Sequence, residues 1–122
     1  MIFMKILLDT NFLVLAGKKV DIYELLSGSE LLTLDSCIRE LEKLAASRKK
    51  DAAAARIAMN VMKGRVKIIK TEAKNTDSAI LGEAKRHKSL AVATNDRKLI
   101  KNLKAHGIRV IRLRQGKMLT EE

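Results

Sequence analysis

Several residue types are scarce in this chain of 122 residues, and each scarcity excludes a class of site. Cys37 is the single cysteine, and proline and tryptophan are absent. One cysteine cannot form an internal disulfide, nor can it build a zinc or iron–sulfur site that needs several thiolates. Because Cys37 falls in an apolar helical pattern, we expect a buried small side chain rather than a reactive thiol.

Aromatic residues and long apolar runs are also scarce. Phe3, Phe12 and Tyr23 are the whole aromatic set. Base-stacking RNA-binding sheets and single-strand-binding barrels need more aromatic platforms, so the sequence disfavours both. The longest apolar runs, such as FLVLA at 12–16, are far shorter than the ~20 residues of a membrane helix. Since the N-terminus has no signal-peptide pattern, we expect a cytoplasmic protein with no membrane segment.

Signatures of several enzyme classes are missing as well. The sequence contains no GxxxxGK[ST] loop for nucleotide phosphates and no nucleophile-elbow glycine pattern. His87 and His106 have no partner at metal-ligand spacing. Both lie near expected helix ends, which predicts surface or capping roles.

The charge is strongly basic and unevenly distributed. Residues 1–61 hold 9 basic and 8 acidic side chains, whereas residues 62–122 hold 16 and 6, so the halves carry +1 and +10. A concentrated basic surface is typical of proteins that bind a polyanion, since each neutralised phosphate releases counterions. Solubility is the alternative explanation, because Lys-rich surfaces also occur in proteins from hot environments.

Hydrophobic periodicity predicts one domain, 1–122, in which strands alternate with helices. We expect strands at 2–8, 31–34, 66–69, 90–93 and 108–113, and helices at 12–26, 36–47 (capped by Ser36), 51–63, 77–88 and 96–106. The tail from about 114 is expected to be loose. This order predicts an α/β fold: a three-layer α/β/α sandwich with a central, mostly parallel sheet of about five strands.

Four acidic residues are placed to meet at one edge of that sheet. Asp9 ends the first strand and Asp96 follows the buried strand at 90–93, while Asp77 opens a helix and Glu40 lies one turn into another. Ligands of such sheets collect beyond the carboxyl ends of the strands. Helical spacing places Asp77 and Asp96 on the apolar stripes of their helices and Glu40 at the edge of its stripe. Glu42, two residues from Glu40, is the competing candidate.

Each of these acids has a simpler explanation when taken alone. An aspartate at a helix start is a preferred cap residue, and Glu40 could pair with Lys43 on the surface. Together, however, inward carboxylates at one rim repel one another and raise their pKa values unless a cation joins them. Mg²⁺ or Mn²⁺ suits such an oxygen-rich shell. An acidic, metal-filled pocket within a basic surface predicts a phosphodiesterase.

At these residues the sequence resembles the PIN-domain nucleases. The matching features are Asp9-Thr10-Asn11 after the first strand, Glu40 after the second, Asp77 in NTDSAIL, and Thr94-Asn95-Asp96 after a hydrophobic strand. The resemblance covers nearly the whole chain and implies that Asp9, Glu40, Asp77 and Asp96 are catalytic metal ligands, supported by Asn11 and Thr94. It implies cleavage of RNA with Mg²⁺ or Mn²⁺, and many members of this family are homodimers. A zinc-ribbon relative is excluded, because one cysteine cannot build the ribbon.

Two branches of the family fit. The stretch ATNDRKLIKNLKAHGIRVIRLRQGKML resembles archaeal stand-alone PIN proteins related to the nucleases of small-subunit rRNA processing, which we favour. The toxins of toxin-antitoxin pairs have the same acids and a similar length. The branches imply different partners besides RNA: ribosome-assembly factors or an antitoxin protein.

Some basic residues are candidate RNA contacts, and two other classes of function fit the sequence in part. Candidate RNA contacts are Arg48, Lys49, Lys50, Arg97 and Lys98. For 48–50, a solvated connection between helices is the simpler reading. A non-catalytic RNA-binding or assembly protein would keep the same scaffold. A flavodoxin-like regulatory domain would require a lysine at the end of a late strand, where none is clearly placed.

Overall fold

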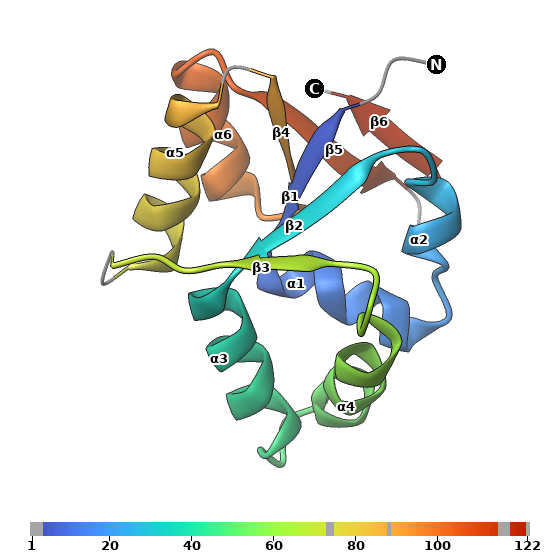
Figure 1. Ribbon diagram of the computed structural model, residues 1–122. Coiled ribbons are helices and arrows are strands. Elements are labelled where there is room, and N and C mark those ends of the chain that lie inside the picture. Colours follow the sequence, from blue (N-terminus) through green and yellow to red (C-terminus); the bar gives the residue numbers. More distant parts are fainter. Residues whose placement is uncertain (1–3, 73–74, 88, 115–117, 122) are drawn as a thin grey trace.

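A twisted, mostly parallel sheet organises the molecule. The computed structural model describes residues 4–72, 75–87, 89–114 and 118–121. Its six strands lie in the order β3-β2-β1-β4-β5-β6 (Figure 1). They are β1 (Lys5–Leu8), β2 (Glu30–Leu34), β3 (Lys67–Ile69), β4 (Leu90–Ala93), β5 (Arg109–Arg114) and β6 (Met118–Glu121).

Helices connect the strands and cover both faces of the sheet (Figure 1). They are α1 (Thr10–Val14), the 3-10 helix η1 (Leu15–Lys18), α2 (Ile22–Leu25), α3 (Asp35–Ala45), α4 (Ala52–Val61), α5 (Thr76–Arg86) and α6 (Arg97–Ala105). The crossovers between parallel strands require these helices. The expected α/β fold with a mostly parallel central sheet is confirmed. No helix within the described ranges is long and apolar enough to cross a membrane.

Two apolar cores lie on the two faces. One joins side chains of β1, α1, α2 and α4, including Ile6, Phe12 and Ile22. The other joins the opposite faces of β1, β2 and β4 to α5 and α6 through Leu7, Val92 and neighbouring residues. All four residues of β4 are buried, because this central strand is covered on both faces.

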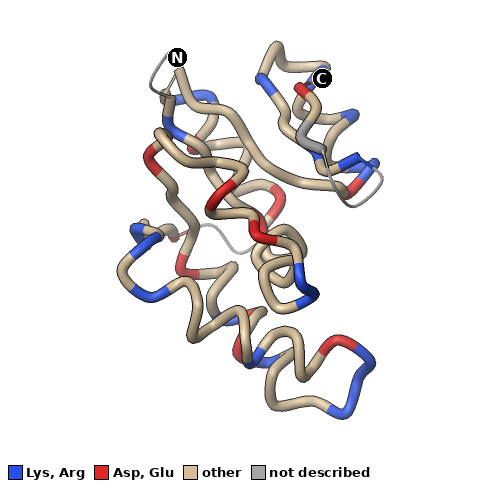
Figure 2. Tube along the Cα trace, turned by 90° about the vertical axis from the view of Figure 1, so that its right-hand side faces the viewer, with Lys and Arg blue, Asp and Glu red and all other residues tan. Residues whose placement is uncertain are grey.

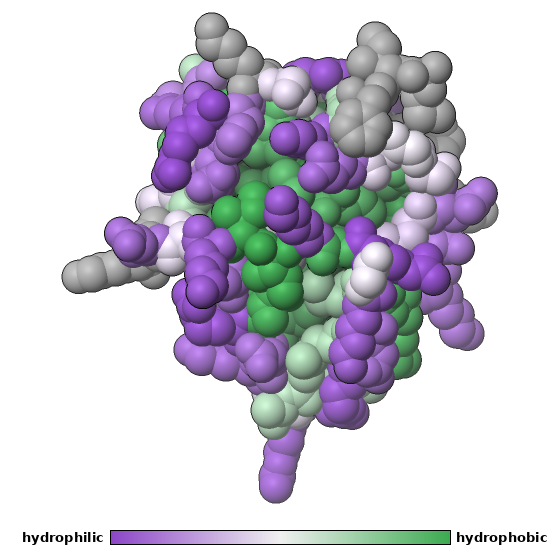
Figure 3. All heavy atoms as spheres, in the orientation of Figure 1, coloured by the Kyte–Doolittle hydropathy of each residue, from purple (hydrophilic) through white to green (hydrophobic). Residues whose placement is uncertain are grey.

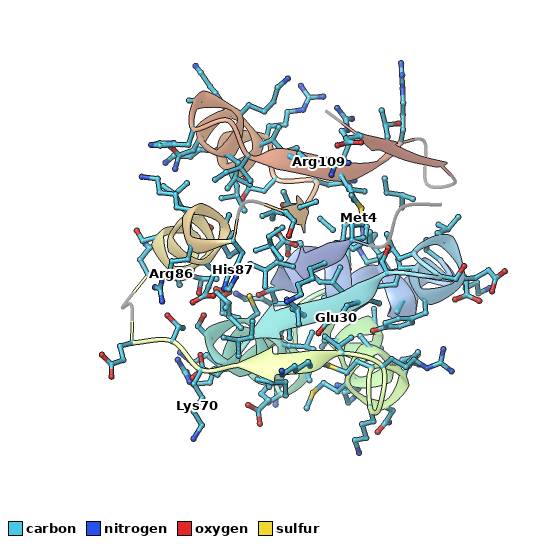
Figure 4. All side chains as sticks on the ribbon, turned by 45° about the horizontal axis from the view of Figure 1, so that its top comes forward. Met4, Glu30, Lys70, Arg86, His87 and Arg109 are labelled. Atoms are coloured by element: carbon cyan, nitrogen blue, oxygen red, sulfur yellow. The ribbon has the colours of Figure 1, made fainter. Side chains whose placement is uncertain are left out.

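The amino-terminal edge of the sheet is closed by backbone contacts. The amide of Glu30 donates to the carbonyl of Met4 at 2.9 Å, and Figure 4 labels these two residues where β2 and β1 begin. Within α5, the buried carboxylate of Glu83 pairs with Arg86 at 3.3 Å and with His87 at 3.6 Å. His87 and His106 follow α5 and α6 as C-cap residues, as the sequence predicts.

The edge strand β3 is the least covered part of the sheet. Ile68 is 51% exposed, and all three residues of β3 are exposed or half-buried. The face seen in Figure 3 carries a hydrophobic area near its centre, surrounded by hydrophilic side chains.

The sequence expectations for secondary structure differ from the structure at two places. The tail expected to be loose forms β6, which pairs antiparallel with β5 from Ile111↔Glu121 to Arg114↔Met118, and residues 115–117 lie outside the described part. The single helical region expected at 12–26 is divided into α1, η1 and α2. The division follows a left-handed residue at Lys19 (φ 66), which ends η1.

Two expected caps also differ. The helix after β2 begins at Asp35, and Ser36 lies inside it. Asp35 accepts the amide of Ser36 at 2.8 Å and that of Thr71 at 3.1 Å. At α5 the cap is Asn75, whose side chain accepts the amide of Ser78. Asp77 is therefore not the cap of α5, although the sequence allowed that role.

Candidate active site

The carboxyl ends of β1 and β4 lie side by side. Leu8 pairs with Ala93 in parallel register, and the amide of Asp9 donates to the carbonyl of Ala93 at 3.2 Å. The residues that follow these strands, Asp9 and Asp96, therefore leave the sheet at the same edge, as the sequence predicts.

Asp9 is held in a buried position. Its side chain is only 6% exposed. Oδ1 accepts the amide of Phe12 at 2.8 Å, which caps α1, and Oδ2 accepts the hydroxyl of Thr94. Asp9 is thus both a helix cap and a member of the candidate site, so the two explanations weighed for it do not compete.

Thr94 connects Asp9 to Asp96. Its side chain is fully buried, and its Oγ1 also accepts the amide of Asp96 at 3.1 Å. Asp96 in turn caps α6, with Oδ1 accepting the amides of Lys98 at 2.9 Å and Leu99 at 3.2 Å. One hydroxyl therefore fixes the spacing of the two aspartates.

Glu40 and Asp77 approach from the two neighbouring helices. Glu40 lies on α3, and its Oε1 accepts the hydroxyl of Thr10 at 2.8 Å. Asp77 is the second residue of α5 and is exposed, although helical spacing places it above the buried Ile80. It is exposed because the first turn of α5 faces an open cavity rather than another element.

The four acids surround one cavity of about 270 Å³. Its lining residues are Asp9, Thr10, Asn11, Glu40, Leu44, Thr76, Asp77, Ile80 and Asp96. The structure thus brings together all four acids and Asn11 at one place, while Thr94 lies beneath as a support. Glu42 is not among the lining residues, which favours Glu40 as the second acid.

Burial and mutual repulsion raise the pKa values in this cavity. The pKa of Asp9 rises to about 6, chiefly because burial penalises its charge, and the charges of Asp96 and Asp77 add to the rise. The hydrogen bonds from Thr94 and Phe12 oppose it. The pKa of Asp77 is also raised, first by the partial desolvation of its carboxylate at the cavity and then by the charges of Asp96 and Glu40. The carboxylates therefore repel one another, and a bound cation would reduce that repulsion.

The carboxylates that line this cavity offer oxygen donors to a cation that keeps part of its water shell. In the described part of the chain, no three His, Cys, Asp or Glu side chains form a group tight enough to enclose a metal ion. Mg²⁺ keeps several of its waters and is bound through one or two carboxylates plus substrate phosphates, so it needs no such cage. Oδ1 of Asp96 accepts two amides, but both oxygens of Asp9 and Oε1 of Glu40 each accept a single hydrogen bond and so retain a lone pair. The donor set of this cavity fits a hard divalent ion.

The predicted basic contacts lie in two places. Arg97 and Lys98 are exposed on the first turn of α6, directly after Asp96. Arg48, Lys49 and Lys50 are exposed in the connection between α3 and α4. None of these five lines the acidic cavity as far as the structure describes it.

Thr10 is the site residue that sequence reasoning missed. It lies next to Asp9, yet its partner Glu40 is 30 residues away. The sequence offers no periodic signal for a contact of this kind, because it depends on how α1 and α3 pack.

Replacing the buried hydroxyl tests how Asp9 is held. Thr94→Val keeps the shape and removes the donor to Oδ2, so we expect the pKa of Asp9 to rise above about 6. The free energy of unfolding should fall by about 1–3 kcal/mol, the cost of a buried hydrogen-bonding group left without its partner. Carbon-detected NMR titration and chemical denaturation measure the two effects. Thr94→Ser, which keeps the hydroxyl, should stay close to the unmodified protein in pKa.

The fold and the site define an α/β protein with a carboxylate-lined cavity at the carboxyl edge of a parallel sheet. Within that class, the chain belongs to the PIN-like domain family, whose profile matches residues 6–116. The resemblance to PIN-domain nucleases expected from the sequence is confirmed.

Individual relatives agree with this membership. The chain is 36% identical over 122 residues to Ribonuclease VapC4 of Methanocaldococcus jannaschii, an alignment that covers 93% of this chain and 92% of the relative. The structure of the PIN domain endonuclease Utp24 is similar at 27% identity with a TM-score of 0.78, covering 97% and 90% of the two chains. A domain of a functionally unknown M. jannaschii protein shares the fold at 18% identity, with a TM-score of 0.62 and 91% of each chain covered.

Proposed function

We propose that this protein is a metal-dependent endoribonuclease that hydrolyses phosphodiester bonds in RNA. The observation that carries the proposal is the meeting of four carboxylates from separate parts of the chain in one cavity. The relatives named as a ribonuclease and as an endonuclease support the same reaction class. The basic second half of the chain, at +10, supports a polyanionic substrate.

Asp9, Glu40, Asp77 and Asp96 would hold Mg²⁺ or Mn²⁺ in this proposal. When bound, the ion would neutralise the phosphate and lower the pKa of a water. One of these carboxylates accepts a proton from the attacking water while the oxygen of that water bonds to phosphorus. The bond from phosphorus to the leaving oxygen then breaks, and solvent protonates that oxygen. Thr10 and Thr94 keep Glu40 and Asp9 in place for this step, and Asn11 at the rim supports the ligands or water.

For the biological role we propose RNA processing, with rRNA as the substrate class and ribosome-assembly factors as partners. The alternative is a toxin ribonuclease neutralised by an antitoxin protein. Both roles use the same four acids, so expression in a bacterial host separates them. A toxin should arrest growth, and an Asp96→Asn variant should not, whereas a processing enzyme should leave growth unchanged.

Metal dependence and the choice of the second acid are tested together. RNA cleavage should be lost in EDTA and restored by Mn²⁺ or Mg²⁺. Glu40→Gln should lower kcat/KM by about ten- to a hundredfold, or about 1.4–2.8 kcal/mol, because it removes one charge from the cavity. Glu42→Gln, the same change two residues away and outside the cavity, should cleave normally. Equal losses in both variants would reject the assignment of Glu40.

A non-catalytic RNA-binding protein is the second candidate, favoured by the net charge alone. It predicts salt-sensitive RNA binding with no turnover in any metal. Turnover that survives repurification and falls about tenfold or more with Glu40→Gln would rule it out.

A further inference from the structure

Helix α6 presents a basic face beside the acidic cavity. Four of its nine residues are basic, and all four are exposed: Arg97, Lys98, Lys101 and Lys104. The helix contains no acidic residue. Its opposite face buries Leu99, Ile100 and Leu103 against the sheet. At 100° per residue, Lys101 lies at the middle of the outward face, with Lys98 and Lys104 on either side.

Two further cavities flank this helix. One, of about 380 Å³, lies between α5 and α6 and is lined by Asp77, Lys98, Leu99, Lys101, Asn102 and Ala105. The other, of about 410 Å³, lies between α6 and β5 and is lined by Arg97, Ile100, Lys101, Lys104 and Arg112. The first has an apolar floor with an amide, and the second is lined by four cationic side chains.

The three cavities neighbour one another, because each shares a lining residue with the next. Asp77 lines both the acidic cavity and the cavity between α5 and α6. Lys101 lines both cavities that flank α6. A path therefore leads from the acids, past Asp77 and over Lys101, to the cationic cavity at Arg112. In Figure 2, basic segments recur in the part of the trace near the C-terminus.

We propose that this path binds the single-stranded RNA that flanks the scissile phosphate, a proposal that rests on the ribonuclease function above. A base would occupy the cavity between α5 and α6, where Leu99 and Ala105 supply apolar surface and Asn102 both donates and accepts hydrogen bonds. The next phosphates would contact Lys98, Lys101 and Lys104. The helix spans about 13 Å at 1.5 Å per residue, so only a short stretch of the strand is held.

The arrangement of charge favours RNA over a solubility role. A surface that serves solubility mixes both signs, as 1–61 does with 9 basic and 8 acidic residues. Helix α6 carries four basic residues and no acidic one, and it adjoins a cavity that needs a cation of its own to accept phosphate. Lysine contacts of this kind position the backbone without reading sequence.

A charge-matched pair of triple variants tests the path. The first is Lys98→Gln, Lys101→Gln and Lys104→Gln. The control is Lys5→Gln, Lys63→Gln and Lys67→Gln, which removes the same charge; Lys5 and Lys67 are exposed where β1 and β3 begin, at the opposite edge of the sheet. The probe is a fluorescent oligouridylate of about 12 nucleotides, a typical single-strand site size. Its Kd is measured in EDTA over a range of salt concentrations, with circular dichroism to check folding.

The α6 triple variant should weaken binding about tenfold or more, and the slope of log Kd against log salt should fall by about 2, near 0.7 for each of three lost contacts. The control should change Kd less than twofold. Equal weakening in both variants, or none in the α6 variant, would overturn the path. Since this binding needs no metal, the result is independent of turnover: wild-type protein that binds through α6 and never cleaves would sink the ribonuclease proposal alone.

Discussion

Asp9→Asn should abolish RNA cleavage and at the same time make the metal-free protein more stable at neutral pH. Loss of a ligand that supplies several kcal/mol of transition-state stabilisation corresponds to a fall of about 10³-fold or more in kcat/KM. Most substitutions of buried polar residues destabilise a protein. A variant that loses activity and gains stability therefore indicates that the buried charge of the carboxylate destabilises the folded protein.

The gain follows from the raised pKa of Asp9. Burial raises the pKa of Asp9 from its ordinary value of 3.8 to about 6 in the folded protein. This rise corresponds to about 3 kcal/mol of destabilisation when the carboxylate is ionised. Asparagine has no charge, keeps Oδ1 for the amide of Phe12, and can donate to Oγ1 of Thr94. Allowing for the altered bond to Thr94, we expect a net gain of about 1–2 kcal/mol at pH 7.

The sign of the pH dependence is fixed by the same shift. A group whose folded pKa is raised contributes stability below its unfolded pKa, near 3.9, and that contribution is lost as the pH rises through about 6. The difference in stability between Asp9→Asn and the unmodified protein should therefore grow from pH 4 to pH 7. Mn²⁺ should raise the melting temperature of the unmodified protein at pH 7 and have little effect on the variant.

Thermal and urea denaturation in EDTA and in Mn²⁺, beside a cleavage assay, measure these effects. Asp21→Asn is the matched control, because Asp21 is exposed and caps α2 by accepting the amide of Glu24 at 3.1 Å. It should cleave normally and change stability by less than about 0.5 kcal/mol. Asp9→Asn protein that is less stable than wild type in EDTA at pH 7 would contradict the strained-charge explanation.

The sheet and the location of the acids could be predicted because they follow from periodicity and from strand ends. A fully apolar LAVA segment predicts a central strand, and parallel strands place the residues after them at one edge. The convergence of Asp9 and Asp96 needs no further information. For Glu40 and Asp77, helical spacing predicts the face of the helix on which each acid lies, but not which residues lie opposite that face.

What could not be predicted depends on packing between segments distant in the sequence. The hydrogen bond from Thr10 to Glu40 joins α1 to α3, and β6 is a strand through its antiparallel pairing with β5. At α5, Asn75 and Asp77 are both good cap residues, so composition does not decide between them. The structure selects Asn75, which leaves Asp77 at the junction of the acidic cavity and the α6 path.

Gly17→Ala should be strongly destabilising. Gly17 lies in η1, where a Cβ would fall 1.9 Å from the carbonyl oxygen of Ala54 and 2.6 Å from its carbonyl carbon. Both are backbone atoms of α4, so no side chain can rotate away, and η1 must separate from α4. We expect a loss of about 3 kcal/mol or more, at the upper end of overpacking costs and a large part of a domain's stability.

Two companion variants make this expectation specific. Gly82→Ala lies inside α5, where the nearest atom is Nη2 of Arg86 at 3.7 Å, an ordinary contact. It should therefore stabilise by about 0.5–1 kcal/mol through helix propensity. The double variant Gly17→Ala, Ala54→Gly removes only a side chain from the opposing residue, so it should remain as unstable as Gly17→Ala or become less stable. Recovery of stability in that double variant, measured by urea denaturation, would show that the clash is with a side chain and not with the backbone of α4.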